Sequence, residues 1–140
     1  MSDPDGASPV GRALKVLIVD DNADGVATLA MLLELTGYDV RTASDGEAAL
    51  VAAESFRPDA IVLDIGLPVL DGYEVARRIR ASSSLGGTTL IALTGYGQDG
   101  DRSHRAGFDH YFVKPTDPRV LFDVLGQCAA DRARARAVEL

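Results

Sequence analysis

The chain has 140 residues, 46% of them hydrophobic, which is the size and composition of one globular domain with its own core. Its 21 acidic residues outnumber 14 basic ones, and the net charge of −7 argues against nucleic acid or an anionic membrane surface as a partner. A single cysteine, Cys128, excludes an internal disulfide, and no apolar run is long enough to cross a bilayer. We therefore expect a reducing, cytoplasmic location and no membrane insertion.

Taken in chain order, the sequence alternates between strand-like and helix-like patterns. Residues 1–12 are rich in Ser, Pro, Gly and Asp, and we expect them to be a disordered lead-in. Five short apolar runs then predict strands, at residues 16–19, 39–43, 60–63, 90–93 and 110–113. Between them apolar residues recur at helical spacing, as in Val26, Leu29, Ala30 and Leu33, in Gly72, Val75, Ala76 and Ile79, and in Leu121, Val124, Leu125 and Cys128. This alternation predicts an α/β fold with a parallel sheet covered on both faces.

Helix boundaries are marked by capping residues. The pairs with capping-box or N-cap spacing are Ser44 with Glu47, Asp71 with Glu74, and Asp117 with Pro118. The predicted helix at residues 98–106 has almost no apolar residue, so it is either a poorly packed surface helix or a segment free to rearrange. The Arg- and Ala-rich residues 131–140 form either a helical extension or, as we rather expect, a solvated tail.

The informative polar residues follow the predicted strands. Asp20 and Asp21 follow the first strand, Asp64 the third and Thr94 the fourth, while the fifth ends in Lys114. Ligands of open α/β sheets bind beyond the carboxyl ends of the strands, where the winding direction reverses. If the strand order is 2-1-3-4-5, the first and third strands are neighbours at that reversal, and the three aspartates would converge there.

Three carboxylates in one place are unstable unless some of them protonate or a cation neutralises them. Two of them about 4 Å apart repel by about 4 kcal/mol at an effective dielectric near 20, and one lysine cannot balance three. Oxygen ligands without His or Cys suit Mg²⁺, with Mn²⁺ as a substitute. A carboxylate beside such an ion can attack a phosphoryl group, whose other oxygens Thr94 and Lys114 are suited to bind. Each residue alone is weak evidence, and the prediction rests on their conjunction.

The same residues carry a family resemblance. The chain resembles the receiver domain of two-component response regulators from about residue 14 to residue 128. The resemblance rests on residues 16–22 (VLIVDDN), 61–64 (IVLD), 67–68 (LP), 71–72 (DG), 91–95 (IALTG) and 114–115 (KP). It implies a flavodoxin-like, doubly wound sheet of five strands with five helices, and we assign residues 13–130 to this receiver domain.

The resemblance also implies roles for individual residues. Asp64 is implied as the phosphoacceptor, with Asp20, Asp21 and the Gly66 backbone carbonyl as further metal ligands. Thr94 and Lys114 match the family's hydroxyl and lysine. Tyr111 matches the aromatic switch residue, and the bond before Pro115 is expected to be cis. The implied phosphodonor is a histidine kinase or a histidine phosphotransfer protein, and the implied readout surface is the face formed by the fourth helix, fifth strand and fifth helix.

Two residues depart from common family patterns. Gly66 stands where a longer side chain often sits, and Tyr96 follows Thr94 by two positions, so both are expected to tune water access to the acceptor. The segment from Thr94 to Pro115 is most similar to receivers of hybrid sensor histidine kinases. We expect a signalling domain that catalyses only its own phosphoryl transfer and dephosphorylation and acts on an unidentified downstream protein.

Two other functions fit the sequence less well. A Mg²⁺-dependent aspartyl-phosphate phosphatase acting on small substrates usually needs an Asp-x-Asp motif at the first strand and a cap domain, which this sequence lacks. A flavin-binding domain would place a phosphate in the loop after the first strand, where Asp20, Asp21 and Asp24 would repel it.

Overall fold

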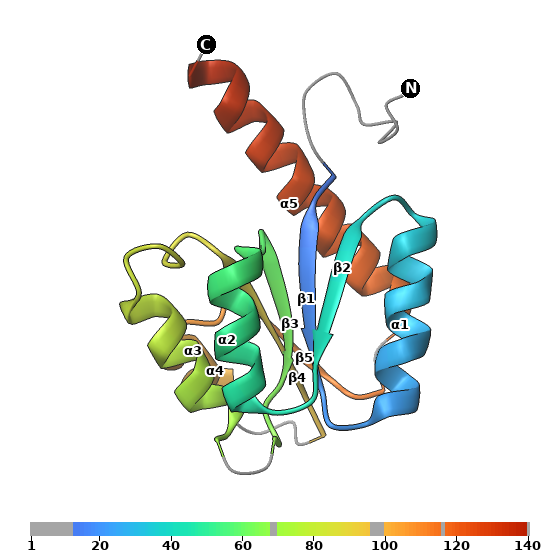
Figure 1. Cartoon of the computed structure of the whole chain (residues 1–140), viewed down its shortest axis with the longest axis vertical. Coiled ribbons are helices and arrows are strands. Elements are labelled where there is room, and N and C mark those ends of the chain that lie inside the picture. The colour runs from blue at the N-terminus through green and yellow to red at the C-terminus, as the bar shows by residue number, and fades with distance from the viewer. Residues whose placement is uncertain (1–12, 68–69, 96–99, 116, 140) are drawn as a thin grey trace.

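Strands and helices alternate five times in the computed structural model, which describes residues 13–67, 70–95, 100–115 and 117–139 (Figure 1). The strands are β1 (Lys15–Val19), β2 (Asp39–Ala43), β3 (Ala60–Asp64), β4 (Thr89–Thr94) and β5 (His110–Val113). The helices are α1 (Ala23–Leu35), α2 (Gly46–Phe56), α3 (Gly72–Ala81), α4 (Gly100–Ala106) and α5 (Pro118–Glu139). The predictions made for residues 1–12, Pro68, Tyr96 and residues 98–99 lie outside the described residues.

All five strands form one parallel sheet in the order β2-β1-β3-β4-β5. β1 and β3 are neighbours, with Val19 opposite Leu63, and the chain winds in opposite directions on either side of this pair. The doubly wound sheet predicted from the sequence is therefore confirmed. Because every strand runs the same way, the carboxyl ends of β1, β3, β4 and β5 lie at the same edge of the sheet.

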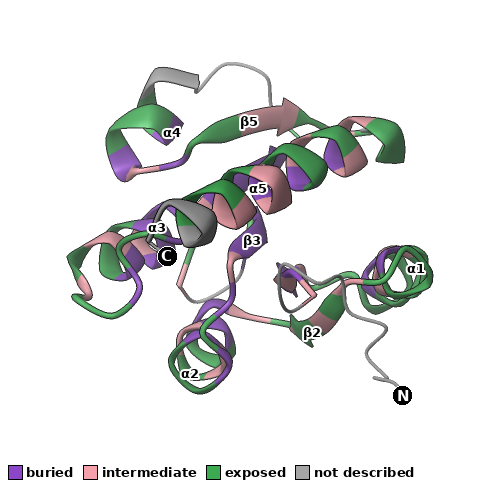
Figure 2. Ribbon diagram, turned by 90° about the horizontal axis from the view of Figure 1, so that it is seen from above, coloured by how far each residue is buried: buried purple, intermediate pink, exposed green. Residues whose placement is uncertain are grey.

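The core has two halves because successive strand residues point to opposite faces of the sheet. Leu17 and Val19 face the half covered by α2, α3 and α4, whereas Val16 and Ile18 face the half covered by α1 and α5. β3 is buried along its whole length between these layers, as Figure 2 shows. Burying one large aliphatic side chain stabilises the fold by roughly 1.5–3 kcal/mol. Because many such side chains are buried on both faces of the sheet, the core holds the strands, and therefore their ends, in place.

The helix caps confirm the prediction for Asp71 and Glu74 and show that the prediction for Ser44 and Glu47 is wrong. The Asp71 carboxylate accepts a hydrogen bond from the Glu74 N–H at 3.0 Å, as its spacing predicted. The predicted cap of α2 at Ser44 is wrong, because Asp45 accepts from the Ala48 N–H at 2.7 Å. The carboxylate of Asp45 sits three residues before Ala48 and is the stronger acceptor for the positive end of the helix.

Helix α5 continues well past the sheet and projects beyond its upper edge in Figure 1. Arg132 in this part is not solvated as we expected for residues 131–140. Its Nη2 donates to the carbonyl oxygens of Asp59 at 2.9 Å and Gly87 at 2.8 Å. These two contacts fix the extension on the amino edge of the sheet, far from the carboxyl ends of the strands.

Candidate metal centre at the carboxyl edge of the sheet

Three aspartates converge where the winding of the sheet reverses. Asp20 and Asp21 directly follow β1, and Asp64 is the last residue of the neighbouring β3. One carboxylate oxygen from each residue lies within 4.8 Å of the others. Asp64 is buried, Asp20 is partly buried and Asp21 is exposed, so the cluster opens to solvent on one side.

Backbone amides orient two of these carboxylates. The Asn22 N–H donates to Asp20 Oδ1 and the Gly66 N–H donates to Asp64 Oδ1, each at 3.0 Å. The Asn22 side chain accepts from the Gly25 N–H at 3.2 Å and so caps α1 itself. Because Asn22 is the N-cap, the acidic pair before it is not needed to cap the helix.

Lys114 approaches the cluster from the residue after β5. Its Nζ lies 3.0 Å from Asp20 Oδ2 and 3.4 Å from Asp64 Oδ2. Its backbone N–H donates to the carbonyl oxygen of Thr94 at 2.7 Å, and the following bond to Pro115 is cis, as the resemblance implied. One ammonium group therefore pairs with two of the three clustered carboxylates.

The two inner carboxylates differ in acidity. Burial raises the pKa of Asp64 above its ordinary value and the charge of Asp20 adds to this, although the Gly66 N–H and Lys114 oppose it. Burial also acts on Asp20, but the hydrogen bonds from Asn22 and Lys114 outweigh it and lower the pKa of Asp20. Desolvation opposes the charge of Lys114, yet Asp20 and Asp64 together raise its pKa. The fold therefore disfavours the ionised form of Asp64, and a cation bound beside it would favour that form again.

The donor set fits a magnesium ion. All the side-chain ligands in the cluster are carboxylate oxygens, and neither a histidine nor the cysteine belongs to it among the described residues. Mg²⁺ prefers such hard oxygen ligands, keeps several waters and usually shares its coordination shell with a phosphate. The exposed side at Asp21 leaves room for those waters. A dication bound beside Asp64 would lower the raised pKa of this residue, because it favours the charged carboxylate.

The remaining predicted residues are placed as follows. Thr94 ends β4 as a buried residue, opposite Val113 of β5. Tyr111 lies in β5 opposite Ala92 and is half-buried. Among the described residues, a Cβ added at Gly66 would meet only Asp64 Oδ1, at the ordinary contact distance of 3.7 Å, so there is space at this position beside Asp64.

Sequence reasoning missed the tight packing of Gly72 behind the acceptor. Its N–H donates to the carbonyl oxygen of Ile65 at 3.0 Å. A Cβ at this position would lie 2.7 Å from Ile65 Cα and 2.9 Å from the Asp64 carbonyl oxygen. The start of α3 thus lies directly against the backbone of the acceptor strand. The Asp71–Gly72 pair is visible in the sequence at the start of α3, but a close approach of two backbones leaves no separate sequence signal.

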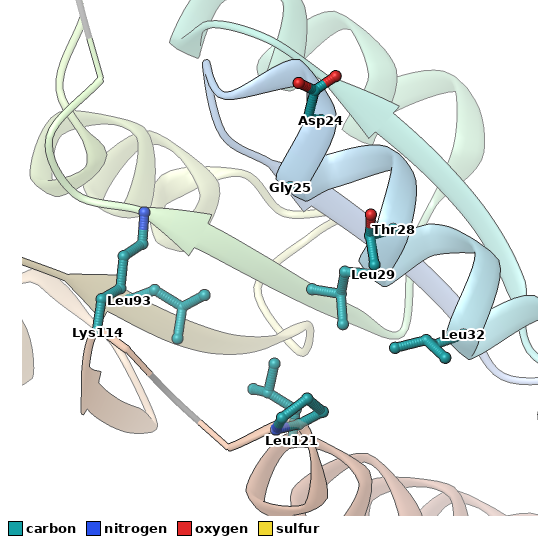
Figure 3. A pocket seen from close by; sticks show the side chains of 9 residues that line it. Asp24, Gly25, Thr28, Leu29, Leu32, Leu93, Lys114 and Leu121 are labelled. Atoms are coloured by element: carbon teal, nitrogen blue, oxygen red, sulfur yellow. The ribbon is translucent and has the colours of Figure 1, made fainter.

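An apolar groove of about 420 Å³ runs between α1 and α5 and is separate from the carboxylates. Leu29 and Leu32 of α1 face Leu93 and Leu121 across it, and Lys114 lies at one end (Figure 3). None of the three clustered aspartates lines it. The charges that make phosphoryl chemistry feasible are in the acidic cluster, so the cluster and not the groove is the candidate site.

An open parallel sheet of this order, with an oxygen-rich site where its winding reverses, defines the doubly wound class of ligand-binding α/β domains. Within that class, the chain belongs to the response regulator receiver domain family, whose model matches residues 16–126. The family match leaves the small-substrate phosphatase reading unfavoured. Among the described residues, no helix is long and apolar enough to span a bilayer.

Curated relatives support the same assignment. The chain is 44% identical over 107 residues to the alkaline phosphatase synthesis transcriptional regulatory protein PhoP of Bacillus subtilis, covering 75% of this chain and 44% of that protein. It is also 44% identical over 101 residues to the transcriptional regulatory protein PrrA of Mycobacterium tuberculosis, covering 72% and 43%. The chain thus spans less than half the length of these relatives.

Solved structures agree with the fold. The chemotaxis response regulator CheY4 of Vibrio cholerae superposes with a TM-score of 0.77 at 31% identity, covering 83% of this chain and 98% of that one. The receiver domain of the sensor histidine kinase PA1611 of Pseudomonas aeruginosa superposes with a TM-score of 0.75 at 37% identity, covering 82% and 96%. That structure has a magnesium ion coordinated in its active-site cleft.

Proposed function

We propose that Asp64 accepts a phosphoryl group from a phosphohistidine donor in a Mg²⁺-dependent reaction. Asp20, Asp21 and Asp64 would hold the ion together with the Gly66 backbone carbonyl, and Mn²⁺ is expected to substitute. The observation that carries this proposal is the convergence of three carboxylates within 4.8 Å with a single lysine beside two of them. A site of this charge favours a dication that brings a phosphate with it.

The transfer needs little covalent chemistry from the protein. A carboxylate oxygen of Asp64 attacks phosphorus, a P–O bond forms, the P–N bond to the donor imidazole breaks and the imidazole nitrogen keeps the electron pair. A bound Mg²⁺ supplies charge neutralisation for the phosphoryl oxygens. Lys114 moves its ammonium from the carboxylates toward the transferred oxygens, and the Thr94 hydroxyl binds another of them.

The donor is proposed to be a histidine kinase or a histidine phosphotransfer protein, as is usual for receiver domains. The matched structures support this, because they include receiver domains of sensor histidine kinases. The curated relatives, by contrast, are transcriptional regulatory proteins that are more than twice as long as the matched segment. Either setting gives the domain the same task, which is to hold a phosphoryl group and present a changed surface.

The readout surface is proposed to be the face of α4, β5 and α5, with Thr94 and Tyr111 as switch residues. Thr94 and the half-buried Tyr111 lie on the adjacent strands β4 and β5, which supports the proposal. Engagement of the Thr94 hydroxyl by a phosphoryl oxygen would be transmitted to Tyr111 across this pair of strands. The partner would be a downstream protein rather than nucleic acid, given the net charge of −7.

Intact-mass spectrometry with Mg²⁺ and acetyl phosphate tests the proposal. The parent chain should gain one phosphoryl group, and the Asp64→Asn variant should gain none. Asp59→Asn is the matched control, because Asp59 stands at the other end of β3 and an amide still accepts from the Lys15 N–H. Phosphorylation of Asp64→Asn at the parent rate would overturn the site, and repeated turnover of small phosphate esters would favour a phosphatase.

A further inference from the structure

Helix α4 is firmly fixed at its carboxyl end. Gly107, with φ of +110°, ends the helix, and its N–H donates to the carbonyl oxygen of His104 while the Phe108 N–H donates to that of Ser103. These two bonds form a Schellman cap, in which glycine avoids the strain that a side chain would suffer at positive φ. Arg80 adds a tertiary contact, because its Nε donates to the Gly107 carbonyl oxygen at 2.8 Å.

The Arg80 guanidinium ties this end of α4 to two other elements. Nη1 donates to the carbonyl oxygens of Gly86 and Thr88, before β4, at 2.9 and 2.6 Å. Nη2 pairs with Asp109, before β5, at 2.7 Å, and the same carboxylate oxygen accepts from the Leu90 N–H at 2.8 Å. The carboxyl end of α4 is therefore a fixed point in the fold.

Nearer its amino end, α4 is held by a different contact. The Arg102 guanidinium carbon lies 4.0 Å from the centroid of the Tyr73 ring, well inside the range of a cation–π interaction. Arg102 is exposed, whereas Tyr73 is only 5% exposed and is the second residue of α3. A contact of this kind at a surface is weak, so it can be broken without unfolding the domain.

Tyr73 is connected to the acceptor through the backbone. It follows Gly72, whose Cα is packed so closely on Ile65 and the Asp64 carbonyl that no Cβ would fit. The start of α3 therefore lies in direct contact with the segment that carries Asp64 and Gly66. The Arg102–Tyr73 contact thus joins α4 to the helix start that packs on the backbone of Asp64.

A buried hydroxyl on α4 opposes this arrangement. Ser103, the next residue after Arg102, is fully buried, and its Oγ has no hydrogen-bond partner among the described residues. An unsatisfied buried hydroxyl is destabilising, because the water it lost is not replaced. α4 has seven residues and buries two side chains of its described part, Ser103 and Ala106, so little apolar packing offsets this cost.

We propose that the Arg102–Tyr73 contact holds α4 in one of two arrangements, which interconvert by pivoting about the end fixed by Arg80. Arg102 acts as a positioning residue for the switch, and the unpaired Ser103 hydroxyl keeps the second arrangement within reach. Occupation of Asp64 strains the contact through Gly72 and Tyr73 and so favours the second arrangement. This inference rests on the proposed function, since it assigns a regulatory consequence to the same acceptor.

The substitution Arg102→Gln tests the contact and keeps the helix propensity nearly unchanged. Its matched control is Arg105→Gln, which removes the same charge from an exposed position on the same helix. With Mg²⁺ present, Arg102→Gln should bind the beryllofluoride phosphoryl mimic roughly two- to five-fold more tightly than the parent, the change expected from losing a surface cation–π contact. The amides of α4 should also exchange faster without the mimic, and Arg105→Gln should match the parent in both measurements.

Two further variants test the direction of the expected change in mimic affinity. Ser103→Ala removes the unpaired hydroxyl, so it should bind the mimic several-fold more weakly and slow amide exchange in α4, the reverse of Arg102→Gln. Tyr73→Phe keeps the ring and should resemble the parent. Equal behaviour of Arg102→Gln and Arg105→Gln, or a Ser103→Ala effect of the same sign as Arg102→Gln, would overturn the inference. Failure of the parent itself to respond to the mimic would instead count against the proposed function.

Discussion

Strand β3 carries an aspartate at each end, and the two have opposite surroundings. Asp59, just before the strand, has every polar group paired. Its Oδ2 accepts from the Lys15 N–H at 2.9 Å, and its Oδ1 lies 3.5 Å from Arg132 Nη1. Its carbonyl oxygen accepts from the Thr89 N–H and from Arg132 Nη2. Asp64, at the far end, shares one lysine with Asp20 and lies beside a third carboxylate.

This comparison separates a structural carboxylate from the proposed phosphoacceptor by their surroundings, because both residues are aspartates. At the amino edge the cations and amides balance the charge, so Asp59 has nothing left to bind. At the carboxyl edge negative charge exceeds positive charge, so Asp64 is held ready for a cation and an electrophile. Substitutions at the two edges should therefore change different properties, with chemistry affected at one and stability at the other.

The largest effect is expected from Lys114→Met. Loss of the ammonium beside Asp64 removes the group that would neutralise the transferred oxygens, which should slow phosphorylation by about 10²–10³-fold. The rate is followed by intact mass with acetyl phosphate and Mg²⁺. Lys15→Met is the control, because Lys15 Nζ donates to the Phe56 carbonyl oxygen at the amino edge and should leave the rate unchanged. A parent-like rate for Lys114→Met would refute the role of this lysine.

Stability should respond most at the amino edge. Arg132→Gln removes a charged donor from two carbonyl oxygens and from the Asp59 carboxylate, and should lower the free energy of unfolding by about 1–3 kcal/mol. Urea denaturation measures this change, while the phosphorylation rate should stay at the parent value. Arg134→Gln, whose guanidinium is exposed and pairs with Asp131 one turn away, should cost less than about 0.5 kcal/mol. Equal losses for the two variants would mean that Arg132 does not anchor α5.

The two edges should also differ in pH dependence. Burial and the charge of Asp20 raise the pKa of Asp64 above its value in the unfolded chain, so an ionised Asp64 destabilises the fold at neutral pH. Without Mg²⁺, Asp64→Asn should therefore be more stable than the parent at pH 7, by on the order of 1 kcal/mol. The difference should shrink as the pH falls through the raised pKa of Asp64 toward about pH 4, because protonation relieves the parent.

Magnesium should reverse this order. A concentration ten times its Kd would stabilise the parent by about 1.4 kcal/mol and Asp64→Asn by less, because one ligand is lost. Denaturation curves at several pH values, with and without Mg²⁺, measure both effects. A parent that gains no stability as the pH falls below neutral relative to Asp64→Asn would contradict the raised pKa.

The sequence predicted the carboxyl edge better than the amino edge. Asp20, Asp21, Asp64 and Lys114 each follow a strand, so knowing where the strands end was enough to bring them together. Asp59 and Arg132 are 73 residues apart, and no local pattern pairs a residue before a strand with one late in a helix. Residues 131–140 were expected to be a solvated tail, because their Arg- and Ala-rich pattern gives no sign of the tertiary partners of Arg132.

The difference between local patterns and long-range contacts also explains the wrong prediction of the α2 cap. Ser44 and Asp45 are both good capping residues, and the choice between them depends on where the first turn of α2 packs. That turn is fixed by Gly46, where a Cβ would lie 2.4 Å from the Leu70 carbonyl oxygen. Contacts between distant segments decide such positions. Hydrophobic periodicity predicted the strands and a sheet covered on both faces, whereas the strand order came from the resemblance to receiver domains.

The smallest effect is expected from Gly66→Asn. Space beside Asp64 is open, since a Cβ would meet Asp64 Oδ1 at 3.7 Å, so the variant should fold and place an amide next to the acceptor. That side chain should change access of the attacking water and alter the autodephosphorylation rate severalfold, about 1 kcal/mol or less in barrier. Decay of the phosphorylated form by intact mass measures it. Gly87→Asn is the control, because a Cβ there meets nothing within 4 Å at the amino edge. Unchanged lifetimes in both Gly66→Asn and Gly66→Arg would show that water reaches the phosphoryl group by a route that residue 66 does not border.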